Sequence, residues 1–170
     1  MNIIKVIKDK KINRWNGLTR TEAYNLEKEC LACIKNNFEC LCKIKHNHFP
    51  ELIEFDDEKY QFILSNCGIS VKEYTKLKKN NIIITNKEEQ VNCIVENLKK
   101  MNIIHLDMSP NGKNMCINED GIISIIDFDI AIINNNILSE QIKKLYNQYT
   151  IKDNYYDNVR KKILKILNKI

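Results

Sequence analysis

The sequence predicts an α+β fold, because short segments with strand periodicity alternate with longer segments of helical periodicity. Residues 3–8 alternate in the manner of a strand, and residues 88–101 carry one apolar stripe at helical spacing. Two stretches, 52–65 and 115–126, each contain paired apolar segments around a polar turn, which predicts two hairpins. The chain has 170 residues, of which 44% are apolar, enough to build the core of one domain or two small lobes.

The helices follow from capping signals and apolar stripes. Thr19 and Glu22 have the spacing of a capping box and predict a helix over about 21–36, with a bent continuation to residue 44 as the alternative. A short helix is expected over residues 70–77. The end of the chain, residues 156–170, predicts an amphipathic helix with an apolar stripe opposite a basic face.

Charge and composition favour anionic ligands without demanding nucleic acid. Lys and Arg number 27 against 22 Asp and Glu, and the formal charge of +5 is spread along the chain. No apolar run approaches membrane-spanning length. The odd number of cysteines, seven, and a start without a signal-peptide core favour a reducing, cytoplasmic location. Heavy use of Asn and Ile suggests a viral source, which would place the protein in the host cytoplasm.

Two cysteine pairs raise the question of a metal site. Cys30 and Cys33 are spaced as in a C-x-x-C motif, and Cys40 and Cys42 follow as C-x-C. Both pairs fall in the segment predicted as helix or its continuation, whereas a zinc knuckle needs a turn. The pattern therefore favours buried thiols over a metal site.

The chemistry of the chain is indicated by three polar groups in its second half. His105 and Asp107 form a His-x-Asp loop, Asn114 follows, and Asp127 begins Asp-Phe-Asp at the end of an apolar strand. Phosphoryl transfer of the kinase type needs a carboxylate beside the attacking hydroxyl, and an amide and a second carboxylate to hold magnesium. The three side-chain types occur here in that order.

The order of elements over about residues 1–135 resembles the protein-kinase-like superfamily, including its small-molecule branch. The thirteen residues from Asn114 to Asp127, with a hairpin between them, resemble the family's spacing of its magnesium ligands. The resemblance implies a two-lobe fold, truncated at the N-terminal Gly-rich hairpin and in the C-terminal helical lobe. The lobes would be residues 1–67 and 68–170, joined near residues 66–70.

The resemblance also implies a role for each residue of the catalytic loop. Asp107 would act as general base for the acceptor hydroxyl, and His105 would brace the loop through backbone contacts. Asn114 and Asp127 would bind Mg²⁺, for which oxygen ligands are suited. Lys113 would reach the transferring phosphate. Asn111 is the alternative to Asn114 as metal ligand.

On the nucleotide side, the resemblance makes Lys8 the lysine that pairs the first two phosphates of ATP. Its helix partner would be Glu27, which lies within the apolar stripe of its helix, where an unpaired carboxylate would be costly. Ser65, Asn66 and Cys67 would offer backbone groups to the adenine edge.

Two departures from the family pattern bear on function. The strand with Lys8 begins the chain, which leaves no room before it for the Gly-rich loop that covers the phosphates. Asp129 stands where protein kinases have the glycine after Phe128, which resembles the small-molecule branch.

The function expected from these motifs is an ATP- and Mg²⁺-dependent kinase that acts on a hydroxyl-bearing substrate, with protein Ser/Thr as first choice. A small-molecule kinase, an inactive kinase-like decoy bound to a partner kinase, and a nucleotide-dependent binding module remain alternatives. A homo-oligomer is a further option for the partner. Activity requires Lys8, Asp107, Asn114 and Asp127 to converge.

Overall fold

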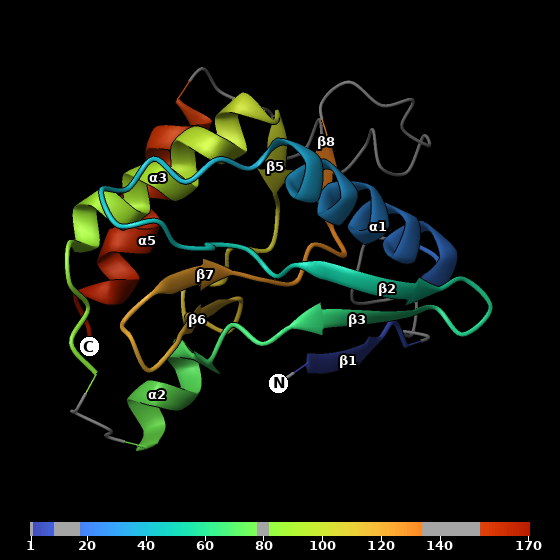
Figure 1. Ribbon diagram of the computed structural model, residues 1–170, viewed down its shortest axis with the longest axis horizontal. Coiled ribbons are helices and arrows are strands. Elements are labelled where there is room, and N and C mark those ends of the chain that lie inside the picture. Colours follow the sequence, from blue (N-terminus) through green and yellow to red (C-terminus); the bar gives the residue numbers. More distant parts are fainter. Residues whose placement is uncertain (1, 9–17, 78–81, 134–153) are drawn as a thin grey trace.

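The computed structural model describes residues 2–8, 18–77, 82–133 and 154–170, and it confirms a mixed α+β fold with small antiparallel sheets (Figure 1). The strands are β1 (Asn2–Val6), β2 (Leu52–Asp56), β3 (Gln61–Ser65), β4 (Ile69–Ser70), β5 (Ile103–His105), β6 (Met115–Ile117), β7 (Ile123–Ile125) and β8 (Ala131–Ile133). The helices are α1 (Arg20–Asn37), α2 (Val71–Leu77), α3 (Lys87–Lys100) and α5 (Tyr155–Leu167).

The first sheet has the strand order β1-β3-β2, and α1 lies across one of its faces (Figure 1). Tyr24 of α1 stacks on Phe62 of β3 with ring centroids 4.6 Å apart, and Phe62 is fully buried. Lys5 of β1 lies directly opposite Phe62 in the antiparallel register. Because directly paired residues share a face of the sheet, Lys5 also points toward α1.

The predicted capping box begins α1. The Thr19 side chain accepts a hydrogen bond from the Glu22 backbone N–H, and the Glu22 carboxylate accepts one from the Thr19 N–H. The helix then ends at Asn37, so the alternative of a bent continuation to residue 44 is wrong. The following segment bonds to α3 instead: the Glu39 N–H donates to Asn97 Oδ1 and the Lys43 N–H donates to the Glu89 carboxylate. These tertiary bonds replace the helical ones.

Two short strand pairings were not predicted from the sequence. β5 and β8 pair antiparallel, with His105 opposite Ala131, and β4 adds to the edge of the β6–β7 hairpin. Each of these strands has only two or three residues, too few to show a period-2 pattern. The β5–β8 pair holds together the two ends of the segment that carries the Asp107 loop and Asp127.

Most of the buried apolar side chains form one large cluster that draws on both predicted lobes. It runs from Tyr24 and Phe62 through Phe128 to Leu98 of α3 and Ile163 of α5. α3 and α5 pack side by side at the end of the molecule away from the first sheet (Figure 1). The division into lobes at residues 66–70 stays a prediction. The expected truncation of the second lobe concerns residues 134–153, which lie outside the described residues. Among the described helices, none has the length and apolar character needed to cross a membrane.

Gly68 occupies the crossing between the first sheet and β4. Its φ of +95° is strained for any residue with a Cβ atom, and a Cβ built there would lie 2.2 Å from the Ile117 carbonyl oxygen. The close approach lets β4 pair with β6 immediately after the crossing.

Gly68→Ala should therefore lower the free energy of unfolding by at least about 1–3 kcal/mol, the usual cost of a strained backbone conformation. Urea denaturation measures the change. Lys99→Ala, on the exposed face of α3, is the control and should change stability by less than about 0.5 kcal/mol. Equal stability of the Gly68→Ala variant and the wild type would contradict the close contact with Ile117.

Candidate functional site

An open cleft of about 390 Å³ lies where β1 and β3 meet the β6–β7 hairpin. Its volume falls in the range of small-molecule sites, roughly 300–1,000 Å³. Its lining is mainly apolar, with a few polar and charged side chains. The residues that line it are Ile3, Ile4, Lys5, Pro50, Leu64, Ser65, Cys67, Gly68, Lys113, Asn114, Cys116, Ile126 and Asp127. Five residues of the predicted site are thus brought together: Ser65, Cys67, Lys113, Asn114 and Asp127.

The charged centre of the cleft is formed by Lys5. Its ammonium group donates to both carboxylate oxygens of Glu27, at 2.7 and 2.6 Å, and to Asp127 Oδ1 at 2.5 Å. The Glu27 side chain is fully buried in α1, whereas the side chains of Lys5 and Asp127 are about one-quarter exposed. One lysine therefore joins the first sheet, α1 and the segment after β7.

The expected pairing of Lys8 with Glu27 is wrong, because Lys5 makes that contact. β1 ends at Val6, and Lys8 lies exposed two residues beyond it, beside a small pocket that Leu18, Arg20 and Asp129 also line. The sequence held a signal for the correct lysine. Lys5 shares a strand face with Ile7, which is buried, and a lysine on a buried face needs an acidic partner.

Asp127 and Asn114 are brought together by the β6–β7 hairpin. Met115 pairs with Ile125, and the Ile126 N–H donates to the Asn114 carbonyl at 3.0 Å, so the two residues that flank the hairpin meet at its open end. Asp127 has a φ of +69°, a left-handed conformation that costs about 1–3 kcal/mol for a non-glycine residue. Such conformations cluster at functional sites, and they persist only where the surrounding structure holds them in place.

The catalytic-loop residues lie at the edge of the same cleft. Lys113 Nζ is 2.7 Å from Asp107 Oδ2, and the Asn114 side-chain amide donates to the Asp107 carbonyl at 2.6 Å. Asn111, the alternative metal ligand, is exposed and does not line the cleft. Its Oδ1 accepts from Ser109 Oγ and from the Lys113 N–H, which closes the turn. The geometry therefore favours Asn114 over Asn111.

His105 lies behind the cleft, where it contacts the backbone. Its Nε2 donates to the Ile126 carbonyl at 3.0 Å, and its ring packs against the buried Phe128 with centroids 5.0 Å apart. Burial lowers the pKa of His105, although its hydrogen bond to Ile126 and nearby carboxylates oppose the shift. A neutral, buried imidazole of this kind positions Asp127 rather than touching a ligand.

The residues expected at the adenine edge are only partly at the cleft. Ser65 and Cys67 line it, with Ser65 held by Glu51 through its N–H and its hydroxyl. Asn66 is exposed and outside the lining, and its Oδ1 accepts from the Gly68 N–H at 2.9 Å. The Asn66 side chain therefore shapes the turn.

The electrostatics of the site are dominated by carboxylates around the partly buried ammonium group of Lys5. Burial alone would lower the pKa of Lys5, but Glu27, Asp127 and Asp129 raise it above its ordinary value. Burial raises the pKa of Glu27 to about 7, and the neighbouring Lys5 opposes that rise. The site thus combines hard oxygen ligands with ammonium groups, a set suited to a metal ion and phosphates.

No protein-family model matches the chain, and a search of curated proteins found no match. Function is therefore inferred from the geometry of the cleft.

Lys5→Met should lower the free energy of unfolding at about pH 8 by about 3–5 kcal/mol, the usual cost of breaking a buried ion pair. Without Lys5, the folded-state pKa of Glu27 rises further above its ordinary 4.5. The folded chain then holds a proton that the unfolded chain loses, so stability falls as the pH rises from about 4.5 through the folded-state pKa. The loss relative to wild type should be smaller at about pH 5.

Urea denaturation at both pH values measures this effect. Lys8→Met is the matched control and should leave stability within about 0.5 kcal/mol of wild type, because Lys8 is exposed. In the double variant Lys5→Met, Glu27→Gln, the free energy of unfolding should no longer fall as the pH rises from about 5 to about 8, because the titrating carboxylate is absent. If Lys5→Met loses the same free energy of unfolding at both pH values, the buried ion pair of Lys5 with Glu27 is contradicted.

Proposed function

We propose that the protein is an ATP- and Mg²⁺-dependent phosphotransferase with a truncated, kinase-like two-lobe arrangement. The observation that carries the proposal is the convergence of Lys5, Asn114 and Asp127 on one cleft, with Asp107 and Lys113 at its edge. These side chains match the parts that phosphoryl transfer requires: a phosphate-binding lysine, two oxygen ligands for magnesium and a carboxylate for the acceptor.

The donor set fits magnesium. Asn114 offers an amide oxygen and Asp127 a carboxylate, and both line the cleft beside the ammonium group of Lys5. Asn114 and Asp127 would hold Mg²⁺, and the ion would supply positive charge against the phosphates. Lys5 would keep its bonds to Glu27 and turn from Asp127 toward a phosphate oxygen. The fully buried Glu27 carboxylate fixes the lysine for that role.

Asp107 is proposed as the general base. Its carboxylate would accept the proton of the attacking hydroxyl, and Lys113, 2.7 Å from it, would move onto the transferring phosphate. The apolar part of the cleft, with Leu64 and Cys67, suits the adenine ring, and the backbone at Ser65 suits its polar edge. A protein Ser/Thr hydroxyl is the first choice of acceptor. A small-molecule hydroxyl is the alternative, and Asp129 in place of glycine favours it.

A second function is favoured by the ion pairs themselves. Lys5 is bonded to Asp127, and Lys113 to Asp107, so both carboxylates needed for transfer are already neutralised by lysines. Neither alternative function needs a carboxylate that is free for transfer. These alternatives are a kinase-like decoy that binds a partner kinase and a binding module that uses nucleotide only to set its shape. Nucleotide binding and transfer distinguish the three functions.

Asp127→Asn should abolish the rise in melting temperature that ATP and Mg²⁺ produce in the wild type, because it removes the charged metal ligand. Asp107→Asn should keep that rise but slow phosphoryl transfer by about 10²–10⁴-fold, the usual contribution of a general base. Thermal denaturation measures binding. Radiolabelled ATP measures transfer to the protein itself, to generic proteins and to sugar alcohols.

The matched control is Asp120→Asn, which changes the same side chain in the exposed turn of the β6–β7 hairpin. It should leave both binding and transfer at the wild-type level. If ATP and Mg²⁺ do not change the melting temperature of the wild-type protein, the kinase function is excluded and the decoy is favoured. Binding without transfer to any acceptor would favour the nucleotide-dependent binding module.

A further inference from the structure

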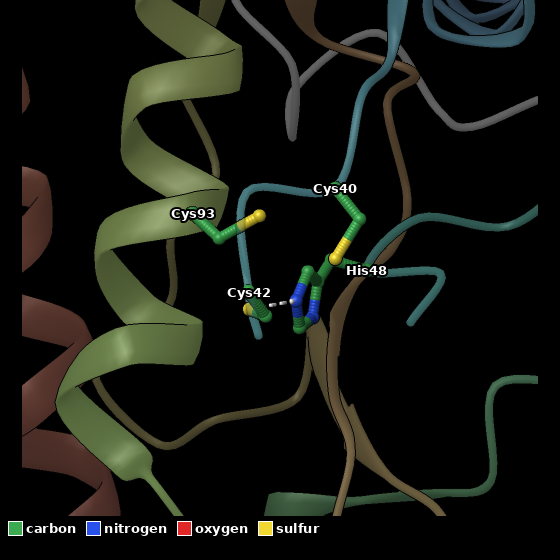
Figure 2. Close-up of side chains that lie close together, drawn as sticks. All are labelled: Cys40, Cys42, His48 and Cys93. Atoms are coloured by element: carbon green, nitrogen blue, oxygen red, sulfur yellow. Dashed lines mark hydrogen bonds between the residues drawn. The ribbon is translucent and has the colours of Figure 1, made fainter. Parts of the chain in front are cut away.

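A second group of side chains lies beside α3 and β7, and the proposed kinase chemistry does not use it. Cys40, Cys42, His48 and Cys93 each direct one ligand atom toward a common centre (Figure 2). Their three sulfurs and one imidazole nitrogen all lie within 4.8 Å of one another. The four residues are buried, with exposed fractions of 8% or less.

The local backbone has the form that a metal site needs. Cys40 and Cys42 lie after the end of α1, in the irregular segment that leads to β2, whereas Cys93 lies on α3. The expectation that the C-x-C pair lies in a helix or its continuation is wrong, because α1 ends at Asn37. Cys30 and Cys33, which do lie in α1, are not part of the cluster.

The distances fit tetrahedral zinc. Zn–S bonds of about 2.3 Å and Zn–N bonds of about 2.0–2.1 Å require S···N separations of roughly 3.5 Å and S···S separations of roughly 3.8 Å. Cys42 Sγ lies 3.4 Å from His48 Nε2. The widest separation in the cluster, at most 4.8 Å, exceeds the tetrahedral edge by about 1 Å, which side-chain rotation can close.

His48 is held in the tautomer that a metal ligand requires. Its Nδ1 lies 2.7 Å from the Ile123 carbonyl oxygen, which can only accept, so Nδ1 carries the proton. Nε2 therefore presents its lone pair toward the three sulfurs. A backbone carbonyl that fixes the second nitrogen of a histidine in this way is the usual support of a metal-bound imidazole.

Hydrogen-bond donors and a lysine lie next to two of the three sulfurs. The Leu41 N–H donates to Cys93 Sγ and the His46 N–H donates to Cys40 Sγ, each at 3.2 Å. The Lys45 ammonium group donates to the Cys40 carbonyl at 2.7 Å and brings a positive charge next to the cluster. Three thiolates around a divalent ion leave one excess negative charge, which these donors and Lys45 would offset.

We propose that Cys40, Cys42, His48 and Cys93 bind one zinc ion as a structural site. Sulfur and imidazole ligands select zinc over magnesium or calcium, and a full set of four protein ligands leaves no open position for catalysis. The ion would clamp the segment between α1 and β2 onto α3 and β7.

The experiment uses the full chain without an affinity tag, produced with zinc in the medium and analysed for metal after gel filtration. We expect one zinc per chain. After removal of zinc with a chelator, the melting temperature should fall, and addition of Co²⁺ should produce thiolate-to-cobalt charge-transfer absorption with the visible bands of a tetrahedral site. These measurements need no variant, so they remain decisive if a cysteine variant fails to fold.

Cys42→Ser and Cys93→Ser should each lower zinc affinity by more than about 100-fold, since loss of a supporting hydrogen bond alone costs about 10–100-fold. Cys33→Ser is the matched control, because it removes a half-buried thiol of α1 outside the cluster. Asp127→Asn should also retain zinc, which separates this proposal from the kinase proposal.

Three results would overturn the zinc site. The first is a protein that carries no zinc and gives no charge-transfer absorption with Co²⁺. The second is a folded Cys93→Ser variant that binds zinc as tightly as the wild type. The third is a mass lower by two hydrogens in freshly purified protein, which would identify a disulfide within the cluster.

Discussion

The structure of the cleft depends on the contact between the Lys5 ammonium group and the buried carboxylate of Glu27. Glu27 is fully buried, and an ionised carboxylate without a partner there would cost several kcal/mol, roughly the stability of a small domain. Lys5 supplies the charge and also bonds Asp127. The Lys5 ammonium group therefore holds β1 against α1, and it holds the segment after β7 against both. Loss of Lys5 would remove a bond between α1 and β1, and it would also remove the cation at the centre of the cleft.

The strained backbone of Asp127 is held by its neighbours on both sides. Before it, Ile126 bonds Asn114 through its N–H and His105 through its carbonyl. After it, Phe128 is fully buried between the rings of Phe49 and His105. Side chains and backbone thus over-determine the residue, which lets a left-handed conformation persist without a glycine. In this conformation the Asp127 carboxylate lines the cleft and bonds Lys5.

Much of the fold could be predicted from local sequence. The helices α1, α3 and α5 carry apolar stripes over several turns, and each hairpin has two apolar segments around a polar turn. The errors concern residues whose positions depend on distant parts of the chain. The choice of Lys5 over Lys8 depends on the end of β1 and its register with β3. The short β5–β8 pair has no periodicity of its own. Asn114 and Asp127 line the same cleft, because the hairpin between them is a local structure. Their metal-binding role stays a prediction.

The positions of Cys40 and Cys42 also depend on distant parts of the chain, and here the sequence favoured a helix where the structure has none. No Gly or Pro precedes Cys40 and Cys42 to mark the end of the helix. Side chains of α3, about fifty residues later in the chain, bond the backbone of this segment outside the helix. β7 connects the two proposed metal sites: its Ile123 carbonyl orients His48, its Ile125 N–H bonds the His48 carbonyl, and Asp127 follows two residues later. An ion that fixes His48 would therefore stiffen the strand that aims Asp127. Soft sulfur ligands would select zinc and hard oxygen ligands would select magnesium, so the two proposed sites would not compete for one ion although one strand supports both.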